Sequence, residues 1–476
     1  MIRPVLCFLV LATGCVAPRV VGPSNPALAK LSDAIDWNAS GDEAVQLLSR
    51  YLQVDTTNPP GNETRGTEFI AAELRAAGLE STTWEFAPGR GSLMARLKAT
   101  GTPEEKPLCL LSHVDVVSAE ADQWPKDAQP LSGAIKDGFV WGRGALDMKG
   151  MGAIELMTMV LLARHHVPLK RDVILIAVAD EEVANGGMHD VVDHHWPELD
   201  CGVLINEGGI GLPGILFEGQ TVFPISVAEK GVLWLELVAK GEAGHGSTPV
   251  PGRAPGKLID AAAKIQAREP KRTIHPALYE LLARAGAQHG GFSGFVLNHP
   301  SLVDGLVTGK LMAVPPTRAA ITNTCQVTGF QGRGSAPNVI PSQVSAIVDC
   351  RVLPSSSGDE VLAELRALLG PDIEVKVLQR EPATESPWDD PFFEALERHL
   401  THGRPDVVVG PALSPGFTDS NLARPKGVKA YGLVPFEINS ELLGTMHGKE
   451  ERVPVKEVKR GLEVLFRSVV DAAGKP

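Results

Sequence analysis

The stretch LLSHVDVV (residues 110–117) decides the fold class, because an apolar run ends there on a histidine and an aspartate. With Leu108 and Cys109 before it, the run is typical of a short buried strand. His113 and Asp115 are two positions apart, so both side chains point to the same side of an extended chain. A buried strand with such an end predicts a polar site at the edge of a sheet.

Strand and helix patterns alternate around this stretch. The segment 66–78 has helical spacing with a glycine stop, and 151–166 is apolar on nearly every face, which predicts a buried helix. DVILIAVADEE (172–182) and GVLINEGG (202–209) are typical of further buried strands. This order predicts an α/β fold, with a mainly parallel sheet and helices on both faces.

Potential metal ligands follow these strands or lie on the glycine-rich turn between them. They are His113, Asp147, the pair Glu181 and Glu182, and Glu207. In open α/β sheets, ligands gather at the carboxyl ends of the strands. Acids and imidazoles crowded there would repel one another without a cation, so they predict a metal site. Mixed oxygen and imidazole ligands suit zinc, and also manganese or cobalt.

Neighbouring residues of this group have separate predicted roles. Asp115 can accept the second N–H of a metal-binding His113 and so orient the ring. Glu181 and Glu182 point in different directions, so one can bind metal while the other holds water. Each residue alone is more often an ordinary polar side chain, whereas their order along the chain indicates a metal centre.

Near Lys230 the pattern changes to alternating apolar and polar residues, which is typical of half-exposed strands. Such strands with two helices predict a smaller α+β domain over 228–380, with an insertion near 270–316. The main domain is then built from 41–227 and 381–476. Its last segment is an amphipathic helix that is predicted to return to the large sheet.

The N-terminus has the pattern of an export signal. A basic residue precedes VLCFLVLA (5–12), which is too short to span a bilayer as a mature helix. The run ends before Cys15 in a sequence that resembles a bacterial lipobox, although Ala12 stands where leucine is usual. The prediction is a signal peptide over 1–15 and a tether over 16–40, in a periplasmic or outer-membrane lipoprotein anchored at Cys15. A plain secretory signal is the alternative.

Charge and composition exclude some partners. The formal net charge of −12 over 476 residues disfavours nucleic acid or an anionic lipid surface as a partner of the whole chain. Seven Trp and three Tyr provide few rings for stacking on single-stranded nucleic acid. A membrane contact is therefore expected only through the N-terminal anchor.

Four cysteines lie beyond the leader. Cys109 and Cys201 fall in or beside apolar runs and are predicted to be buried thiols. Cys325 and Cys350 are candidates for a pair across neighbouring strands, and the sequence leaves that pairing open. No CxxC or dense spacing is present, so disulfides are not expected to hold the fold together.

Seven motifs in a fixed order resemble the M20 metallopeptidases. They are SHVDVV, WGRGALDMKGMG, ADEE, NEGG, GHGSTP, PNVIP and TMHGKEE, spread between about 50 and 470. The family contains carboxypeptidases, aminoacylases and deacylases of amino-acid precursors. The VAEKG sequence and the insertion resemble the carboxypeptidase-S and N-acyl-amino-acid hydrolase branch. The resemblance implies a zinc-peptidase catalytic domain with an inserted ferredoxin-like lid and dimerisation domain.

The resemblance implies two zinc ions per subunit. Asp147 matches the carboxylate that bridges the two ions. His113 and Glu207 match the ligands of one ion, and Glu182 and His447 match those of the other.

The same resemblance implies roles in catalysis and substrate binding. Glu181 matches the general base, which takes a proton from water and passes it to the leaving nitrogen. His245 matches a lid histidine that stabilises the oxyanion, from the partner subunit in several relatives. Arg351 and Thr418 match a pocket for the substrate carboxylate, and Asn323 is a weaker candidate. A turn histidine and a surface ion pair are the alternatives for His245 and Arg351.

The resemblance also implies a cis peptide bond between Asp147 and Met148. Two departures stand out: Asn206 occupies a position where relatives often carry aspartate, and the insertion near 270–316 could cover the dimer edge. The second departure leaves both the homodimer and the origin of His245 open.

The sequence thus predicts a two-metal amidohydrolase that acts on a C-terminal amino acid of a small peptide or on an N-acyl amino acid. One alternative is a deacylase of a succinyl- or acetyl-amino-acid precursor, which the export signal disfavours. Another is a peptide-binding lipoprotein without catalysis.

Overall fold

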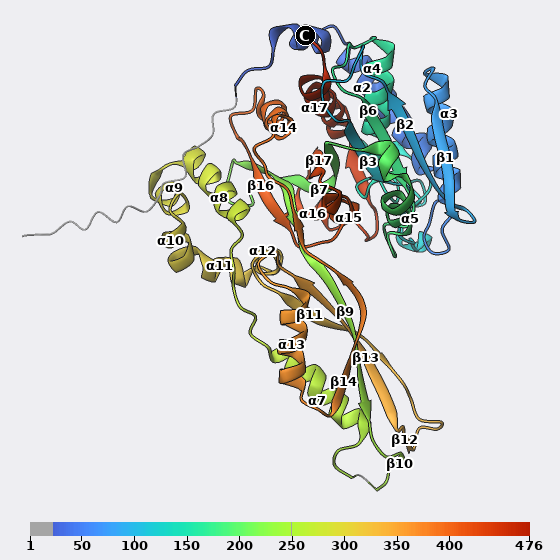
Figure 1. The fold of residues 1–476 in the computed structure, drawn as a ribbon, viewed down its shortest axis with the longest axis vertical. Coiled ribbons are helices and arrows are strands. Elements are labelled where there is room, and N and C mark those ends of the chain that lie inside the picture. The colour runs from blue at the N-terminus through green and yellow to red at the C-terminus, as the bar shows by residue number, and fades with distance from the viewer. Residues whose placement is uncertain (1–21, 249) are drawn as a thin grey trace, which may run out of the picture.

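The computed structural model describes residues 22–248 and 250–476, whose arrangement is drawn in Figure 1. A large sheet flanked by helices forms one part, and a slender four-stranded sheet extends away from it. The predicted signal peptide (1–15), its Cys15 and the first part of the predicted tether lie outside the described residues. Within the described part of the chain, no helix combines the length and apolar composition needed to span a bilayer.

The large sheet has nine strands in the order β1-β2-β6-β3-β7-β17-β8-β15, with β16 paired to β8. Their bounds are β1 (Ser81–Ala87), β2 (Arg90–Leu97), β3 (Leu108–His113), β6 (Val173–Val178), β7 (Val203–Pro213), β8 (Thr221–Glu229), β15 (Thr384–Glu385), β16 (Val407–Ser414) and β17 (Lys429–Glu437). The pairs β6–β3, β3–β7, β7–β17 and β8–β16 are parallel, while β1–β2, β2–β6 and β15–β8 are antiparallel. The predicted α/β fold with a mainly parallel central sheet is confirmed.

Side chains of β3 alternate between two hydrophobic clusters, one on each face of the sheet. Leu108 and Leu110 belong to the cluster of α2 (Trp37–Leu52), α4 (Lys149–Arg164) and α17 (Val455–Ala473). Cys109 and Leu111 belong to the cluster of α5 (Gly186–Asp190), α6 (Trp196–Leu199) and α15 (Asp419–Ala423). Helices therefore cover both faces, as predicted.

The N-terminal segment is helical where a tether over 16–40 was predicted. Helix α1 (Pro26–Asp33) begins at Asn25, whose side chain accepts a hydrogen bond from the Ala27 N–H (2.9 Å). Leu28 is buried, and α1 packs against α17. The Pro- and Ala-rich composition concealed this helix, because proline is tolerated in a first helical turn.

The small sheet has the strand order β11-β13-β9-β14 and is antiparallel throughout. Its elements are β9 (Gly231–Lys240), α7 (Ala254–Ala267), β11 (Thr324–Gln331), β13 (Gln343–Val352), α13 (Gly358–Leu369) and β14 (Ile373–Glu381). This succession is the βαββαβ order of ferredoxin-like domains. The two helices share one hydrophobic cluster with the sheet, so they cover one of its faces.

The segment predicted as an insertion in the small domain packs on the large sheet instead. It forms α8 (Pro276–His289), α9 (Gly291–Leu297), α10 (Pro300–Leu302), α11 (Thr308–Ala313) and α12 (Pro315–Ile321). Leu281 of α8 clusters with Val222 and Ala412 of the large sheet. The Arg284 guanidinium donates to the Val409 carbonyl of β16 (3.1 Å). Helical periodicity shows that α8 has an apolar face, but not which sheet that face covers.

Two disulfides are present, so the prediction of buried thiols at Cys109 and Cys201 is wrong. These two residues are bonded to each other, with a Cα–Cα distance of 5.9 Å. Cys201 lies just before β7, and the parallel pairing of β7 with β3 brings it beside Cys109. The pairing of Cys325 with Cys350, which the sequence left open, is formed between directly opposed residues of β11 and β13.

Lys230 joins β8 to β9, and its side chain is fully buried at this junction. Its ammonium group donates to the carbonyls of Ala319 (3.1 Å) and Thr322 (2.9 Å) and to the Thr324 hydroxyl (2.9 Å). Burial, together with the nearby charge of Arg351, lowers the pKa of Lys230 to about 7.

We expect Lys230 to make the stability of the fold depend on pH. In the unfolded chain its pKa returns to about 10.4, so between pH 7 and 10 the unfolded state binds more protons. Raising the pH therefore favours the folded state by up to about 1.4 kcal/mol per pH unit from this residue. Urea denaturation of the wild type and of Lys230→Met at a series of pH values measures this contribution. The same slope in both proteins would contradict it.

Candidate metal centre and active site

The five side chains predicted to bind metal converge on one point at the edge of the large sheet. Asp147 lies at its centre: one carboxylate oxygen is 3.1 Å from His113 Nε2, and the other is 3.0 Å from His447 Nε2. His447 Nε2 is also 3.1 Å from Glu182 Oε2, and His113 Nε2 is 3.8 Å from Glu207 Oε1. Each oxygen of Asp147 thus faces a different histidine, as a bridging carboxylate requires.

Different elements bring these side chains together. His113 is the last residue of β3, and Glu182 follows β6 after a turn in which Asp180 adopts a left-handed φ of 71°. Asp147 precedes α4, and its peptide bond to the next residue, Met148, is cis, as expected. Glu207 was predicted to end its strand, but β7 continues past it to Pro213.

The site offers oxygen and nitrogen atoms at distances that suit divalent cations. One ligand atom from each of His113, Asp147 and Glu182 lies within 4.8 Å of the others, and the same holds for His113, Glu181 and Glu207. The Glu182 Oε1 atom is buried and has no hydrogen-bond partner among the described residues. A carboxylate oxygen in that position fits a metal ligand, because buried acceptors are otherwise satisfied. The mixed set of carboxylates and imidazoles suits zinc, cobalt or manganese.

The pKa values of the side chains in this site reflect the crowding of the acids. Burial, and then the neighbouring carboxylates, raise the pKa of Glu207 and of Glu181 well above the ordinary range. Hydrogen bonds to Asp147 and Glu182 raise the pKa of His447 to about 10. Positive charge is thus favoured among these acids, and divalent cations would provide it.

Asp115 holds both the histidine and the glutamate pair in place. Its two carboxylate oxygens accept hydrogen bonds from the backbone N–H groups of Glu181 and Glu182 (3.1 Å each). One of these oxygens is 3.6 Å from His113 Nδ1, and the Asp115 carbonyl oxygen lies 2.9 Å from the same nitrogen. The contact at hydrogen-bond distance is thus made by the Asp115 backbone carbonyl and not by its carboxylate, which was the predicted acceptor, and it leaves Nε2 of His113 facing the centre.

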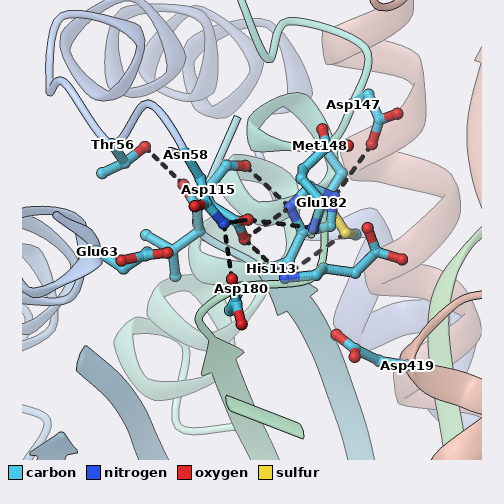
Figure 2. Close-up of polar contacts among 12 residues, drawn as sticks. Thr56, Asn58, Glu63, His113, Asp115, Asp147, Met148, Asp180, Glu182 and Asp419 are labelled. Carbon is cyan, nitrogen blue, oxygen red and sulfur yellow. Dashed lines mark hydrogen bonds and ion pairs between the residues drawn. The ribbon is translucent and has the colours of Figure 1, made fainter. Parts of the chain in front are cut away.

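Asn58 connects two loops of the site, a role that the sequence did not predict. Its amide group donates to Asp115 (2.8 Å) and to Asp180 (2.9 Å), as Figure 2 shows. Arg90 in turn binds Asp180 (2.5 Å) and Glu63 (2.7 Å), so one guanidinium joins these two acids beside the site. The only available signal was the sequence Asn-Pro-Pro-Gly, which marks a turn but no role.

Glu451 holds the turn that carries Asp147, and this role was not predicted from the sequence either. Its Oε1 accepts from the N–H groups of Leu146 (2.8 Å) and Asp147 (3.2 Å). Its Oε2 accepts from Gly144 N–H (3.1 Å) and pairs with the buried Arg143 (2.5 Å). The second half of the TMHGKEE motif thus positions the residue that the first half, through His447, contacts.

Thr418, predicted to bind the substrate carboxylate, has partners inside the protein. Its hydroxyl donates to Glu229 Oε1 (2.8 Å), and it caps the start of α15. The next residue, Asp419, is fully buried and accepts from Asn185 (3.0 Å); burial raises the pKa of Asp419 to about 7. Asp419 is the first residue of α15, and its negative charge contributes to the raised pKa of Glu181.

The other predicted substrate residues lie in the segments of the small domain. His245 is in β10 (Gly244–His245), which pairs with β12 (Val339–Ile340) in a separate two-stranded sheet at the end of the small domain farthest from the large sheet (Figure 1). Its Nε2 atom is 3.1 Å from Asn338 Nδ2, so within one chain it does not join the centre. Arg351 pairs with Asp349 (2.9 Å), and Asn323 accepts from the Leu353 N–H (2.7 Å), a structural contact.

Comparison with known proteins decides the family. The sequence model of peptidase family M20/M25/M40 matches residues 109–471, which is most of the chain. The chain belongs to this family. All of the candidate metal ligands named above lie within the matched M20 region, and the protein is a hydrolase of the metallopeptidase and amidohydrolase type.

Several M20 relatives align with most of this chain. The N-fatty-acyl-amino acid synthase/hydrolase PM20D1 of Mus musculus is 28% identical over 384 residues, which are 78% of this chain and 75% of the relative. Aminoacylase-1 of Sus scrofa is 25% identical over 445 residues, 91% of this chain and 96% of the relative. Among solved structures, the M20 metallo-carboxypeptidase Sso-CP2 of Sulfolobus solfataricus has a TM-score of 0.64 at 18% identity, covering 90% of this chain and 99% of that one. That likeness shows that the fold is shared.

Proposed function

We propose that this protein is a two-zinc amidohydrolase that releases a C-terminal amino acid from a small peptide or the acyl group from an N-acyl amino acid. The observation that carries the proposal is the convergence of His113, Glu182, Glu207 and His447 around Asp147. Two M20 relatives support the substrate class by their names, N-fatty-acyl-amino acid synthase/hydrolase and aminoacylase.

The chain supplies a base and a fixed geometry for the hydrolysis of an amide. Two divalent ions, when bound, would polarise the substrate carbonyl and lower the pKa of water to about 7. Glu181 lies beside His113 and Glu207 and takes the proton that water releases when it attacks. It then passes this proton to the leaving nitrogen. Asp115 keeps the backbone of Glu181 in place throughout, because it accepts its N–H.

His245 would then act on the site of a partner subunit. Within one chain it lies in β10, at the end of the small domain farthest from the large sheet, where its ring contacts Asn338. We expect His245→Ala and Glu181→Gln homodimers to be inactive, and a mixture of the two, after subunit exchange, to regain activity. In a mixed dimer, one site combines the intact Glu181 of one subunit with the intact His245 of the other. A mixture that stays inactive although mixed dimers form would contradict action in trans.

A hydrolysis screen tests the proposed reaction. We expect release of free amino acids from N-acyl amino acids or dipeptides, complete loss after dialysis against a chelator, and recovery with zinc. Elemental analysis of the active protein should find about two zinc ions per chain. Intact protein that holds less than one equivalent and hydrolyses none of these substrates would instead support a binding lipoprotein.

Amidated analogues in the same screen test the proposed carboxylate pocket. Arg351 can release Asp349 to bind a substrate carboxylate, so Arg351→Ala should mainly impair substrates with a free carboxylate. Equal damage to amidated analogues would count against Arg351.

The proposed location is outside the cytoplasm, with a lipid anchor at Cys15. Two disulfides support export, because such bonds persist in oxidising compartments. The mass of the mature N-terminal peptide tests the anchor: an acylated Cys15 supports it, and an unmodified N-terminus elsewhere contradicts it.

A further inference from the structure

The helical lobe, defined here as residues 270–321 (α8 to α12), exposes large apolar side chains. Phe292 is 77% exposed and Phe295 is 55% exposed, and Leu306 (60%) and Val314 (50%) belong to the same lobe. Figure 1 shows the lobe projecting from one side of the large sheet. Exposed apolar residues concentrated in one lobe indicate a contact surface rather than chance exposure.

The orientation of α9 is set by its tightly packed inner side. Val296 and Leu297 are buried, and Gly294 packs so closely on α8 that an added Cβ would lie 2.3 Å from the Gly286 carbonyl oxygen. Phe292 and Phe295 are three positions apart, so they share a face of the helix. Since the inner side is fixed against α8, both phenyl rings are held outward.

The charge of the lobe is opposite to that of the chain. Residues 270–321 contain five Lys and Arg but only two acids, a net charge of +3 in a chain of −12. The acids are already engaged: Glu280 pairs with Arg284 (2.7 Å), and Asp304 accepts from the Tyr279 hydroxyl (2.5 Å). The remaining cations are exposed, and none has a carboxylate within ion-pair distance among residues 22–248 and 250–476. They are Lys271, Arg272, Lys310 and Arg318.

We propose that the helical lobe docks the protein on an anionic lipid bilayer. Peripheral helices that bind in the headgroup region of a bilayer carry exposed aromatic rings and unpaired cations. The rings leave water, and the cations contact lipid phosphates. The negative net charge of the whole chain disfavoured an anionic lipid surface as a partner, but the net charge of the lobe is positive. A second copy fits less well, because a symmetric contact would bring the same unpaired cations together.

Vesicle binding tests this docking surface without requiring the metal site. The full chain carrying Cys15→Ser, which removes the acylation point, is sedimented with vesicles of phosphatidylglycerol and phosphatidylcholine. We expect Phe292→Ser/Phe295→Ser to lower its partition coefficient by about tenfold or more. Lys310→Glu/Arg318→Glu should weaken binding on these vesicles but not on pure phosphatidylcholine.

A matched control lies on β14 of the small sheet. Val377 and Leu378 are 42% and 53% exposed, and Val377→Ser/Leu378→Ser should leave the partition coefficient unchanged. Thermal unfolding and the hydrolytic activity of every variant should stay at the level of the parent, since exposed positions are changed.

Three outcomes would overturn the proposal. The first is equal partitioning of the phenylalanine variant and its parent. The second is equal binding of the parent to anionic and to zwitterionic vesicles. The third is a dimer of the parent in solution that the phenylalanine substitutions dissociate, which would make the lobe an interface between copies of the chain.

Discussion

Glu181→Gln is expected to lower kcat by about 10²–10⁴-fold while both metal ions stay bound. The substitution keeps the shape of the side chain but removes the base that accepts the proton from water. The backbone contact of this residue to Asp115 is unaffected, so the loop should keep its place. Steady-state kinetics and elemental analysis of the purified variant measure the two quantities.

Glu182→Gln is the matched control, since it changes the adjacent residue in the same way. Glu182 Oε2 lies 3.1 Å from His447, and its other oxygen is buried without a partner among the described residues. This variant should lose metal together with activity. Glu181 also has a potential ligand atom, within 4.8 Å of those of His113 and Glu207. If Glu181→Gln loses metal and Glu182→Gln retains it, the two roles must be exchanged.

Glu451→Ala is expected to lower the free energy of unfolding by about 3–5 kcal/mol, because it leaves the buried Arg143 without its partner. It also removes the acceptor of the Leu146 and Asp147 N–H groups, so the turn that presents Asp147 loses its support. Weaker zinc binding should accompany the lower stability. Urea denaturation and competition with a zinc chelator measure these effects.

Glu104→Ala provides the comparison for an exposed ion pair. Glu104 lies 3.2 Å from Lys475, and both side chains are about half exposed to water, so its removal should cost about 0–1 kcal/mol. The double variant Arg143→Ala/Glu451→Ala should be less destabilised than the sum of the single changes, since no charge is then left buried alone. Glu451→Ala with normal stability and normal zinc affinity would show that the turn does not depend on this carboxylate.

Local sequence patterns predicted the central elements of the fold well. The continuous apolar runs of β3 and β6, and the all-round apolar α4, are properties of short segments that do not depend on their neighbours. The helix α1 was missed, because its few apolar residues become significant only when Leu28 packs against α17.

The candidate site was predictable as a set of residue types and less so as a network. His113 and Glu207 end apolar runs and Asp147 lies on a glycine-rich turn, which marks them in the sequence. Asn58 and Glu451 lie in no such position, and their importance comes from hydrogen bonds to segments far away along the chain.

The sequence alone determined the alternation of strands and helices, the nature of the candidate metal-binding side chains and the net charge, because these depend on composition and on local periodicity. The tertiary structure decided which distant segments meet. The register of β3 and β7 joined Cys109 to Cys201, the apolar face of α8 was buried on the large sheet, and His245 was placed far from the metal ligands. Such contacts depend on how whole elements pack together, and no local pattern of residues records that packing.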